Sequence, residues 1–225
     1  MALDSIIAID GPAGSGKSTV ARLVAKKLSF TYVDTGAMYR ALTLKAIREG
    51  INLQDENELA NLAKRTALDV TNDKNGNIKV LLDNEDVAGF IRTPELTAKV
   101  HYLAGVGRVR KKMVKSQRKI GQRGRCVFEG RDITTVVFPE SKYKFYIDAS
   151  LKERTNRRYK ELIETGEINP EDKTLDEIET DIRVRDSKDK TRDIAPLRRA
   201  EDAIYIDTTD MAIEEVINEV CSYIK

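Results

Sequence analysis

The segment that most constrains this chain is Gly11-Pro12-Ala13-Gly14-Ser15-Gly16-Lys17-Ser18, which directly follows the apolar run at residues 6–9. Glycines at this spacing let the backbone fold around phosphate oxygens with its N–H groups pointing inward, and a following helix adds the positive end of its dipole. In a phosphate-binding loop (P-loop) of this kind the Lys17 ammonium reaches the β- and γ-phosphates and the Ser18 hydroxyl ligates Mg²⁺. The alternative is a glycine-rich turn that binds nothing, but the flanking strand and helix favour a site for a nucleoside triphosphate.

Short apolar runs that are typical of buried parallel strands recur along the chain, and each is followed by a segment of helical character. The strands are expected at residues 6–9, 32–33, 126–128, 145–147 and 203–206. The helices are expected at residues 18–28, 37–49, 106–120, 151–165 and 212–224. This alternation predicts the α/β class: a doubly wound parallel sheet of about five strands, with helices on both faces and ligands at the carboxyl ends of the strands.

Two regions interrupt the alternation. Residues 68–91 contain alternating apolar residues around Asn75-Gly76, then a second polar turn and the run 87–91, a pattern that predicts a small antiparallel β insert. Residues 166–193 are crowded with charge, which by itself indicates a solvated helix with neighbouring ion pairs.

Composition limits the function classes. The 225 residues include 39 basic and 37 acidic side chains, a net charge of +2, so any affinity for phosphate has to be local. No stretch approaches the roughly 20 apolar residues that cross a bilayer, and the first strand begins too soon for a signal peptide. We therefore expect a cytoplasmic protein without membrane association, whose two cysteines, Cys126 and Cys221, stay reduced.

Other motifs narrow the phosphate chemistry. The Asn-Lys-x-Asp segment that recognises guanine is missing from the sequence, which disfavours a GTPase. Charged residues stand where predicted strands end, in Asp34-Thr35-Gly-Ala-Met-Tyr-Arg40 and in Glu129-Gly-Arg131-Asp132. Arginines at this edge suit a second phosphate compound, because a guanidinium can hold phosphate at two points and offset transition-state charge.

Together these motifs resemble the bacterial cytidylate kinases, within the nucleoside monophosphate kinases, over nearly the whole chain. The resemblance rests on G-P-A-G-S-G-K-S, D-T-G-A-M-Y-R, the hairpin insert ending near Ile91-Arg92-Thr93, R-V-R at 108–110, E-G-R-D followed by T-V-V-F-P, and R-D-S-K-D-K-T-R-D-I-A-P-L at 185–197. It implies a monomeric, ATP-dependent phosphotransferase that moves the γ-phosphoryl group of ATP to CMP or dCMP, with Mg²⁺ as cofactor.

The resemblance also implies roles for single residues. ATP would be bound by the P-loop with Thr19, and by lid arginines at Arg154, Arg157 and Arg158. The acceptor nucleotide would be bound by Thr35, Arg40, His101, Arg110, Arg131, Asp132, Arg185, Asp189 and Arg192. The catalytic set would be Lys17, Arg131, Arg192 and Arg157. The reaction needs no general base, because the acceptor is already an ionised phosphate oxygen.

Asp132 gives a physical account of base choice. Its carboxylate can accept a hydrogen bond from the exocyclic amino group of cytosine, whereas uracil presents a carbonyl at that position. Two facing acceptors leave polar groups unpaired, at a cost of about 1–3 kcal/mol. A preference for CMP over UMP follows; the alternative is that Asp132 pairs with neighbouring Arg131 at the surface.

The remaining expectations concern the metal, the lid and the domain limits. Asp34 and Glu129 both end strands near the P-loop, and either of them would organise Mg²⁺ through water; the alternative for each is a strand-end carboxylate without a role in metal binding. Arg154 and Arg157 or Arg158 share a helix face and would close over the ATP phosphates, unless that basic face is simply in water. We expect a core of residues 1–36, 94–150 and 193–225, a nucleotide-acceptor region of 37–93 with the insert at about 67–92, and a helical lid with the following substrate-binding segment at 151–192.

Three residues depart from the family pattern: His101 where serine is common, Gly107 where proline is frequent, and Thr134 where glycine is frequent. A lone histidine is also compatible with a packing role. Two other functions stay open at this stage, a kinase of another small acceptor and a nucleic-acid-binding protein. The second would use the basic residues Arg108, Arg110, Lys111, Lys112, Lys115, Arg118, Lys119, Arg123 and Arg125, although no aromatic residues are interleaved for base stacking.

Overall fold

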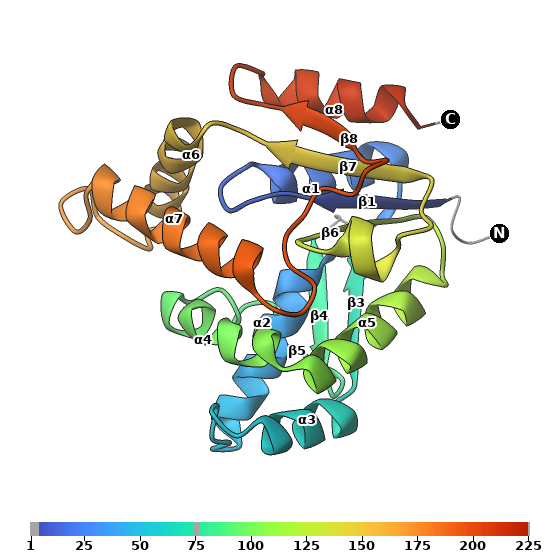
Figure 1. Ribbon diagram of the computed structural model, residues 1–225, viewed down its shortest axis with the longest axis vertical. Coiled ribbons are helices and arrows are strands. Elements are labelled where there is room, and N and C mark those ends of the chain that lie inside the picture. Colours follow the sequence, from blue (N-terminus) through green and yellow to red (C-terminus); the bar gives the residue numbers. More distant parts are fainter. Residues whose placement is uncertain (1–4, 74–76, 225) are drawn as a thin grey trace.

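A parallel β-sheet forms the centre of the computed structural model, which describes residues 5–73 and 77–224 (Figure 1). Its strand order is β2-β6-β1-β7-β8. The strands are β1 (Ile6–Asp10), β2 (Thr31–Asp34), β6 (Cys126–Gly130), β7 (Tyr143–Asp148) and β8 (Ile204–Asp207). The predicted α/β class and all five parallel strands are confirmed. The P-loop follows β1, the central strand, so residues from both halves of the sheet can reach it.

Helices cover both faces of the sheet because successive side chains of β1 point in opposite directions. Ile7 and Ile9 pack with α1 (Lys17–Leu28) and α8 (Ile213–Ser222) in one apolar cluster. Ile6 and Ala8 pack on the other face with α2 (Thr35–Arg48) and α5 (Gly107–Gly121). The arrangement is doubly wound, as the alternation of strands and helices predicted.

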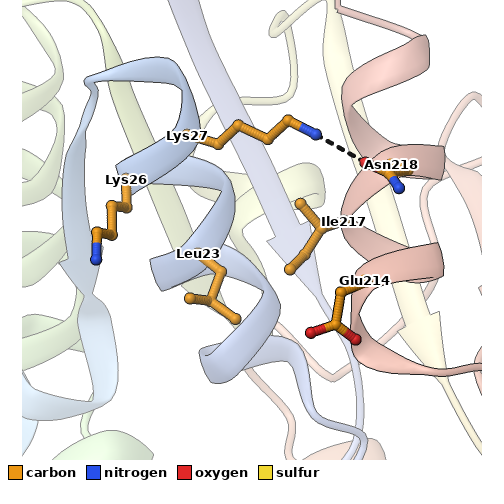
Figure 2. Close-up of a pocket in the computed structure, with 6 residues that line it drawn as sticks. All are labelled: Leu23, Lys26, Lys27, Glu214, Ile217 and Asn218. Carbon is orange, nitrogen blue, oxygen red and sulfur yellow. Dashed lines mark hydrogen bonds between the residues drawn. The ribbon is translucent and has the colours of Figure 1, made fainter.

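A shallow groove separates α1 from α8 on the first of these faces. Figure 2 shows its six lining residues, Leu23, Lys26, Lys27, Glu214, Ile217 and Asn218. Lys27 Nζ donates to Asn218 Oδ1 at 2.7 Å across it. None of the six is a predicted site residue, so this groove is separate from the candidate site.

The predicted β insert is a second, antiparallel sheet of β3 (Leu68–Asn72), β4 (Ile78–Leu82) and β5 (Glu85–Asp86). Val70 lies opposite Val80 in the register. The predicted turn residues Asn75-Gly76 lie outside the described residues. The last strand is β5, and the run 87–91 does not extend it, because Val87 and Ile91 are buried with Ala37 and Ala41 of α2.

Four elements had no range of their own in the sequence-based expectation: α3 (Glu56–Arg65), α4 (Pro94–Gly105), α7 (Leu175–Thr191) and a π-helical turn, η2 (Ile133–Val137). The charged segment at 166–193 is mostly the long helix α7, whose N-terminus has a capping box between Thr174 and Glu177. It packs against α6 (Leu151–Glu164), and this helix pair stands to one side of the sheet (Figure 1). In the described part of the chain, no helix has the length and apolar character needed to span a membrane.

Candidate functional site

The P-loop adopts the conformation that its glycines predicted. Gly14 and Gly16 have φ of +73° and +83°, values that other residues rarely adopt. A Cβ on Gly11 would lie 2.0 Å from the carbonyl oxygen of Ile147, so only glycine fits there. Lys17 opens α1 and is buried, with Nζ donating to the carbonyl of Pro12 at 3.2 Å. Desolvation, helped by the charge of Arg131, lowers the Lys17 pKa to about 7.

The two candidate carboxylates at the metal position differ in their contacts. Ser18 Oγ donates to Glu129 Oε1 at 2.7 Å, and the Tyr32 hydroxyl donates to the same oxygen at 3.2 Å. Burial raises the pKa of Glu129, and the neighbouring Asp34 raises it further. Asp34 instead caps α2 through the N–H of Ala37 and pairs with Arg40 at 2.7 Å. Burial would raise the Asp34 pKa, but Arg40 and the Ala37 N–H outweigh it and hold the pKa below its ordinary value.

These contacts indicate which of the two carboxylates is better placed to bind Mg²⁺. A hydroxyl and a carboxylate oxygen in contact are the hard donors that Mg²⁺ prefers. Of the two carboxylates, Glu129 is the one that touches Ser18. The donor set therefore fits Mg²⁺ at Ser18 and Glu129 better than at Asp34.

Arginines from distant parts of the sequence meet beside the P-loop. Arg131 Nη1 donates to the carbonyl of Gly11 at 2.9 Å, and its Nε donates to Asp189 Oδ2 at 2.7 Å. Arg192 lies 3.9 Å from Asp189 Oδ1 and 3.8 Å from Asp132 Oδ1. The end of β6, the end of α7 and the P-loop thus converge on one place.

Several of these guanidiniums have donors to spare. Arg192 Nη2 and Arg40 Nε are buried and have no hydrogen-bond partner among the described residues. Arg185 makes no hydrogen bond or ion pair with any residue that the structure describes. Arg185 is exposed at the surface, and partial desolvation and the positive charge of Arg131 lower its pKa. Unpaired donors in a positive field are the features of an anion-binding site.

The predicted base pocket is built around Asp132. Arg110 Nη2 donates to Asp132 Oδ2, and Arg110 also lies 5.9 Å from the centre of the Tyr39 ring. Asp132 is buried and pairs with Arg110, not with its neighbour Arg131. Asp132 Oδ1 accepts no hydrogen bond from the described residues. Thr35 Oγ1 donates to the carbonyl of Glu129 at 2.8 Å, on the same side of the sheet.

The lid arginines occupy three different environments. Arg157 lies over the P-loop, with Nη1 3.4 Å from the Ser15 carbonyl and 2.9 Å from Thr208 Oγ1. Arg158 makes no contact with the P-loop among the described residues and pairs with Glu161 at 2.9 Å and Glu167 at 3.5 Å. Arg154 is buried, and its guanidinium is bound to protein oxygens on three sides, at Ala149, Ala13 and Asp186. Of the three, Arg157 has the placement expected of a residue that contacts ATP.

His101 is not brought into the base pocket. It is exposed on α4, where its Nδ1 lies 2.7 Å from the carbonyl of Ala98. Its ring packs beside Tyr102, with 4.1 Å between the ring centres. Among the described residues, no hydrogen bond or ion pair joins it to Arg110 or Asp132.

The sequence-based interpretation missed Asp10, the last residue of β1. Asp10 is fully buried and accepts hydrogen bonds from Ile133 N, Thr134 N and Thr134 Oγ1 at 2.9, 2.7 and 2.6 Å. Burial raises its pKa to about 6. It therefore fixes η2, which directly follows Arg131 and Asp132. A charged residue at the end of an otherwise apolar strand was the available signal, and Thr134, a departure from the family pattern, supplies the hydroxyl.

The basic segment of α5 and the following loop is largely used within the protein. Arg110 pairs with Asp132, Arg123 pairs with Asp69, and Arg118 donates to the carbonyls of Val136 and Val137. Arg108 and Lys112 donate to Asn57 and Lys64. Carboxylates thus neutralise Arg110 and Arg123, and three further side chains of the segment are engaged within the protein, which leaves fewer of its basic groups available to a nucleic acid.

Comparisons with known proteins agree with these observations. The sequence model of a family described as cytidylate kinase matches residues 7–225. The cytidylate kinase of Carboxydothermus hydrogenoformans is 47% identical over 219 residues, covering 97% of this chain and 96% of that protein. The cytidylate kinase of Bacillus subtilis is 46% identical over 215 residues, covering 95% and 93%.

A solved structure supports the fold alone. An uncharacterized protein from Eubacterium ventriosum superposes with a TM-score of 0.50 at 14% identity, covering 98% of each chain.

Proposed function

The chain belongs to the cytidylate kinase family, and we propose that its site transfers the γ-phosphoryl group of ATP to CMP or dCMP, giving ADP and the corresponding diphosphate. The observation that carries the proposal is the position of Arg131. Its guanidinium is bonded to the P-loop at Gly11 and to Asp189 on α7. An acceptor phosphate at this arginine would lie next to the loop that holds the donor phosphates, as direct transfer requires.

The donor side uses the P-loop, Lys17 and Arg157. The loop N–H groups and the start of α1 would hold the ATP phosphates, and Arg157 would add a charge from above. Ser18 and Glu129 would hold Mg²⁺, directly or through water. Mg²⁺ would neutralise charge on the β- and γ-phosphates. Burial lowers the pKa of Lys17 to about 7, which disfavours its ammonium form, and the negative charge of bound phosphate would raise that pKa again and favour the ammonium.

The acceptor side uses guanidiniums that meet beside the P-loop, two of which have an unbonded donor atom. Arg131, Arg192 and Arg40 would surround the CMP phosphate, and the unbonded donors of Arg192 and Arg40 would be satisfied by its oxygens. Arg185 would lie by the sugar. Asp189 would bind the sugar hydroxyls. The acceptor oxygen is already ionised, so these residues orient it and offset the charge of the transition state.

The nucleoside would be read by Asp132 Oδ1, the oxygen that Arg110 does not engage. It would accept a hydrogen bond from the amino group of cytosine. The ion pair with Arg110 and the burial of the carboxylate would fix the orientation of the Asp132 side chain. Tyr39 and Thr35 complete the pocket wall on α2.

Other parts of the proposal concern the whole protein. Residues 1–36, 94–150 and 193–225 would form the core, 37–93 the acceptor region, and 151–192 a lid that excludes water when it closes. One chain supplies every site residue named here, which is consistent with a monomer. The two cysteines, both free, suit the reducing cytoplasm.

The decisive experiment is a coupled ADP-release assay with CMP, dCMP, UMP, AMP and GMP as acceptors. We expect turnover with CMP and dCMP well above that with the others. Equal use of UMP or AMP would contradict the substrate assignment while leaving the kinase activity intact. No turnover with any acceptor would contradict the kinase activity itself.

A further inference from the structure

One residue of the P-loop, Ala13, is held at both its backbone N–H and its backbone carbonyl by side chains of α6 and α7. Asp186 Oδ1 on α7 accepts a hydrogen bond from Ala13 N at 3.0 Å. Arg154 Nη1 on α6 donates to the Ala13 carbonyl at 2.9 Å. The two side chains are joined to each other, with Arg154 Nη1 donating to Asp186 Oδ2 at 2.5 Å. All three residues are buried.

Apolar contacts cover this arrangement on the side of the P-loop. Ala13 packs in a cluster with Leu162 of α6 and with Ile178 and Ile182 of α7. A Cβ added to Gly14 would come within 2.8 Å of the Arg154 carbonyl, so α6 lies directly against the loop. The Arg154–Asp186 pair is therefore mostly buried on the side of the P-loop, while its other side lines a hollow of about 300 Å³ next to Leu151 and Lys190. Breaking a largely buried, hydrogen-bonded ion pair is energetically costly.

The contact also orients other site residues. Arg157 is three residues after Arg154 and lies on the same face of α6, beside the Ser15 carbonyl. Fixing Arg154 against Ala13 therefore fixes the direction in which Arg157 crosses the P-loop. On the acceptor side, Asp189 has an anchor of its own in Arg131. The Ala13 contact is thus directed mainly at the donor nucleotide.

We propose that Asp186 is a positioning residue which, through Arg154 and the backbone N–H and carbonyl of Ala13, holds the P-loop and Arg157 in the geometry that binds ATP. This changes the expected role of Arg154 from a phosphate contact to a support of the loop. The inference rests on the proposed kinase function. Its test therefore includes ATP binding, which is measured without any acceptor.

The main variant is Asp186→Asn, which keeps the shape of the side chain and removes its charge. Its amide nitrogen cannot accept from Arg154, so the support of the Ala13 carbonyl weakens. A charge-assisted hydrogen bond of this kind corresponds to roughly tenfold or more in affinity. We expect the Kd for a fluorescent ATP analogue and the KM for ATP to rise about tenfold, with the KM for CMP changed less than about twofold.

A matched control lies on the same helix. Asp181 is exposed on α7 and pairs with Lys173. Asp181→Asn removes the same charge without touching the P-loop, and we expect it to leave the Kd and both KM values unchanged.

A second variant keeps the proposal testable if Asp186→Asn does not fold, as judged by circular dichroism. Arg154→Lys keeps the charge but cannot donate to Ala149, Ala13 and Asp186 at once. We expect it to weaken ATP binding in the same direction. An unchanged Kd for the ATP analogue in whichever folded variant is measured would overturn the proposal. An equal rise in the KM values for ATP and CMP would also overturn it, because it would indicate that the whole site is less ordered. If the variants weaken binding of the ATP analogue as expected but the unmodified protein does not turn over CMP, the result would count against the proposed function and not against the role of Asp186.

Discussion

Asp132 is the residue on which the account of base choice depends, and Asp132→Asn is the change that tests it. Arg110 engages Oδ2 in the folded protein. In the variant, Arg110 needs an acceptor and would therefore face the amide oxygen. The amide NH₂ would then point toward the base, where it can donate to the carbonyl of uracil but opposes the amino group of cytosine.

The expected magnitude follows from the cost of an unpaired buried polar group, about 1–3 kcal/mol. This corresponds to a change of roughly 5- to 150-fold in the ratio of kcat/KM for CMP to kcat/KM for UMP. The direction is toward UMP, mostly through a weaker CMP reaction. Steady-state kinetics with both acceptors at saturating ATP gives the ratio directly.

Stability has to be measured in parallel, because Asp132 pairs with a buried arginine. Loss of one partner of a buried pair costs about 3–5 kcal/mol when the remaining charge is uncompensated, but asparagine still offers Arg110 an oxygen. We therefore expect a lower melting temperature in a cooperative, folded variant. An unchanged CMP to UMP ratio in such a variant would refute the reasoning about Oδ1.

The remaining predictions address the donor side. Lys17→Met should lower kcat by at least about a hundredfold without lowering the melting temperature at pH 7. Desolvation lowers the pKa of Lys17 from 10.5 to about 7, so the contribution of Lys17 to the free energy of unfolding rises with pH between these values. The variant should lack that rise in thermal melts recorded across this pH range. Glu129→Gln should raise the Mg²⁺ concentration for half-maximal activity about tenfold or more, and a larger effect of Asp34→Asn would reverse the metal assignment. Arg157→Ala should raise the KM for ATP, whereas Arg158→Ala, which removes a surface pair, should not; equal effects in initial-rate measurements would contradict the different placements of the two arginines.

Much of the fold could be read from the sequence because the information is local. Continuous apolar runs such as residues 6–9 are typical of strands buried on both faces, and helical segments follow them. The charged helix α7 was harder to recognise, because its buried positions are few and its apolar periodicity is weak. Its start was nevertheless present in the sequence as Thr174 followed three residues later by Glu177.

The sequence by itself determined the P-loop, the chemical types of the site residues and the order of the parallel strands along the chain. Only the tertiary structure decided which of those residues touch. It placed Glu129 rather than Asp34 on Ser18, put Arg154 beneath the loop and left His101 at the surface. It also revealed Asp10 and Asp186 as supports of the site. The physical reason is that a motif depends on residues adjacent in the chain, whereas the partner of a buried charge is fixed only when the whole core packs. That partner can be distant in sequence: Asp186 and Ala13 are 173 positions apart.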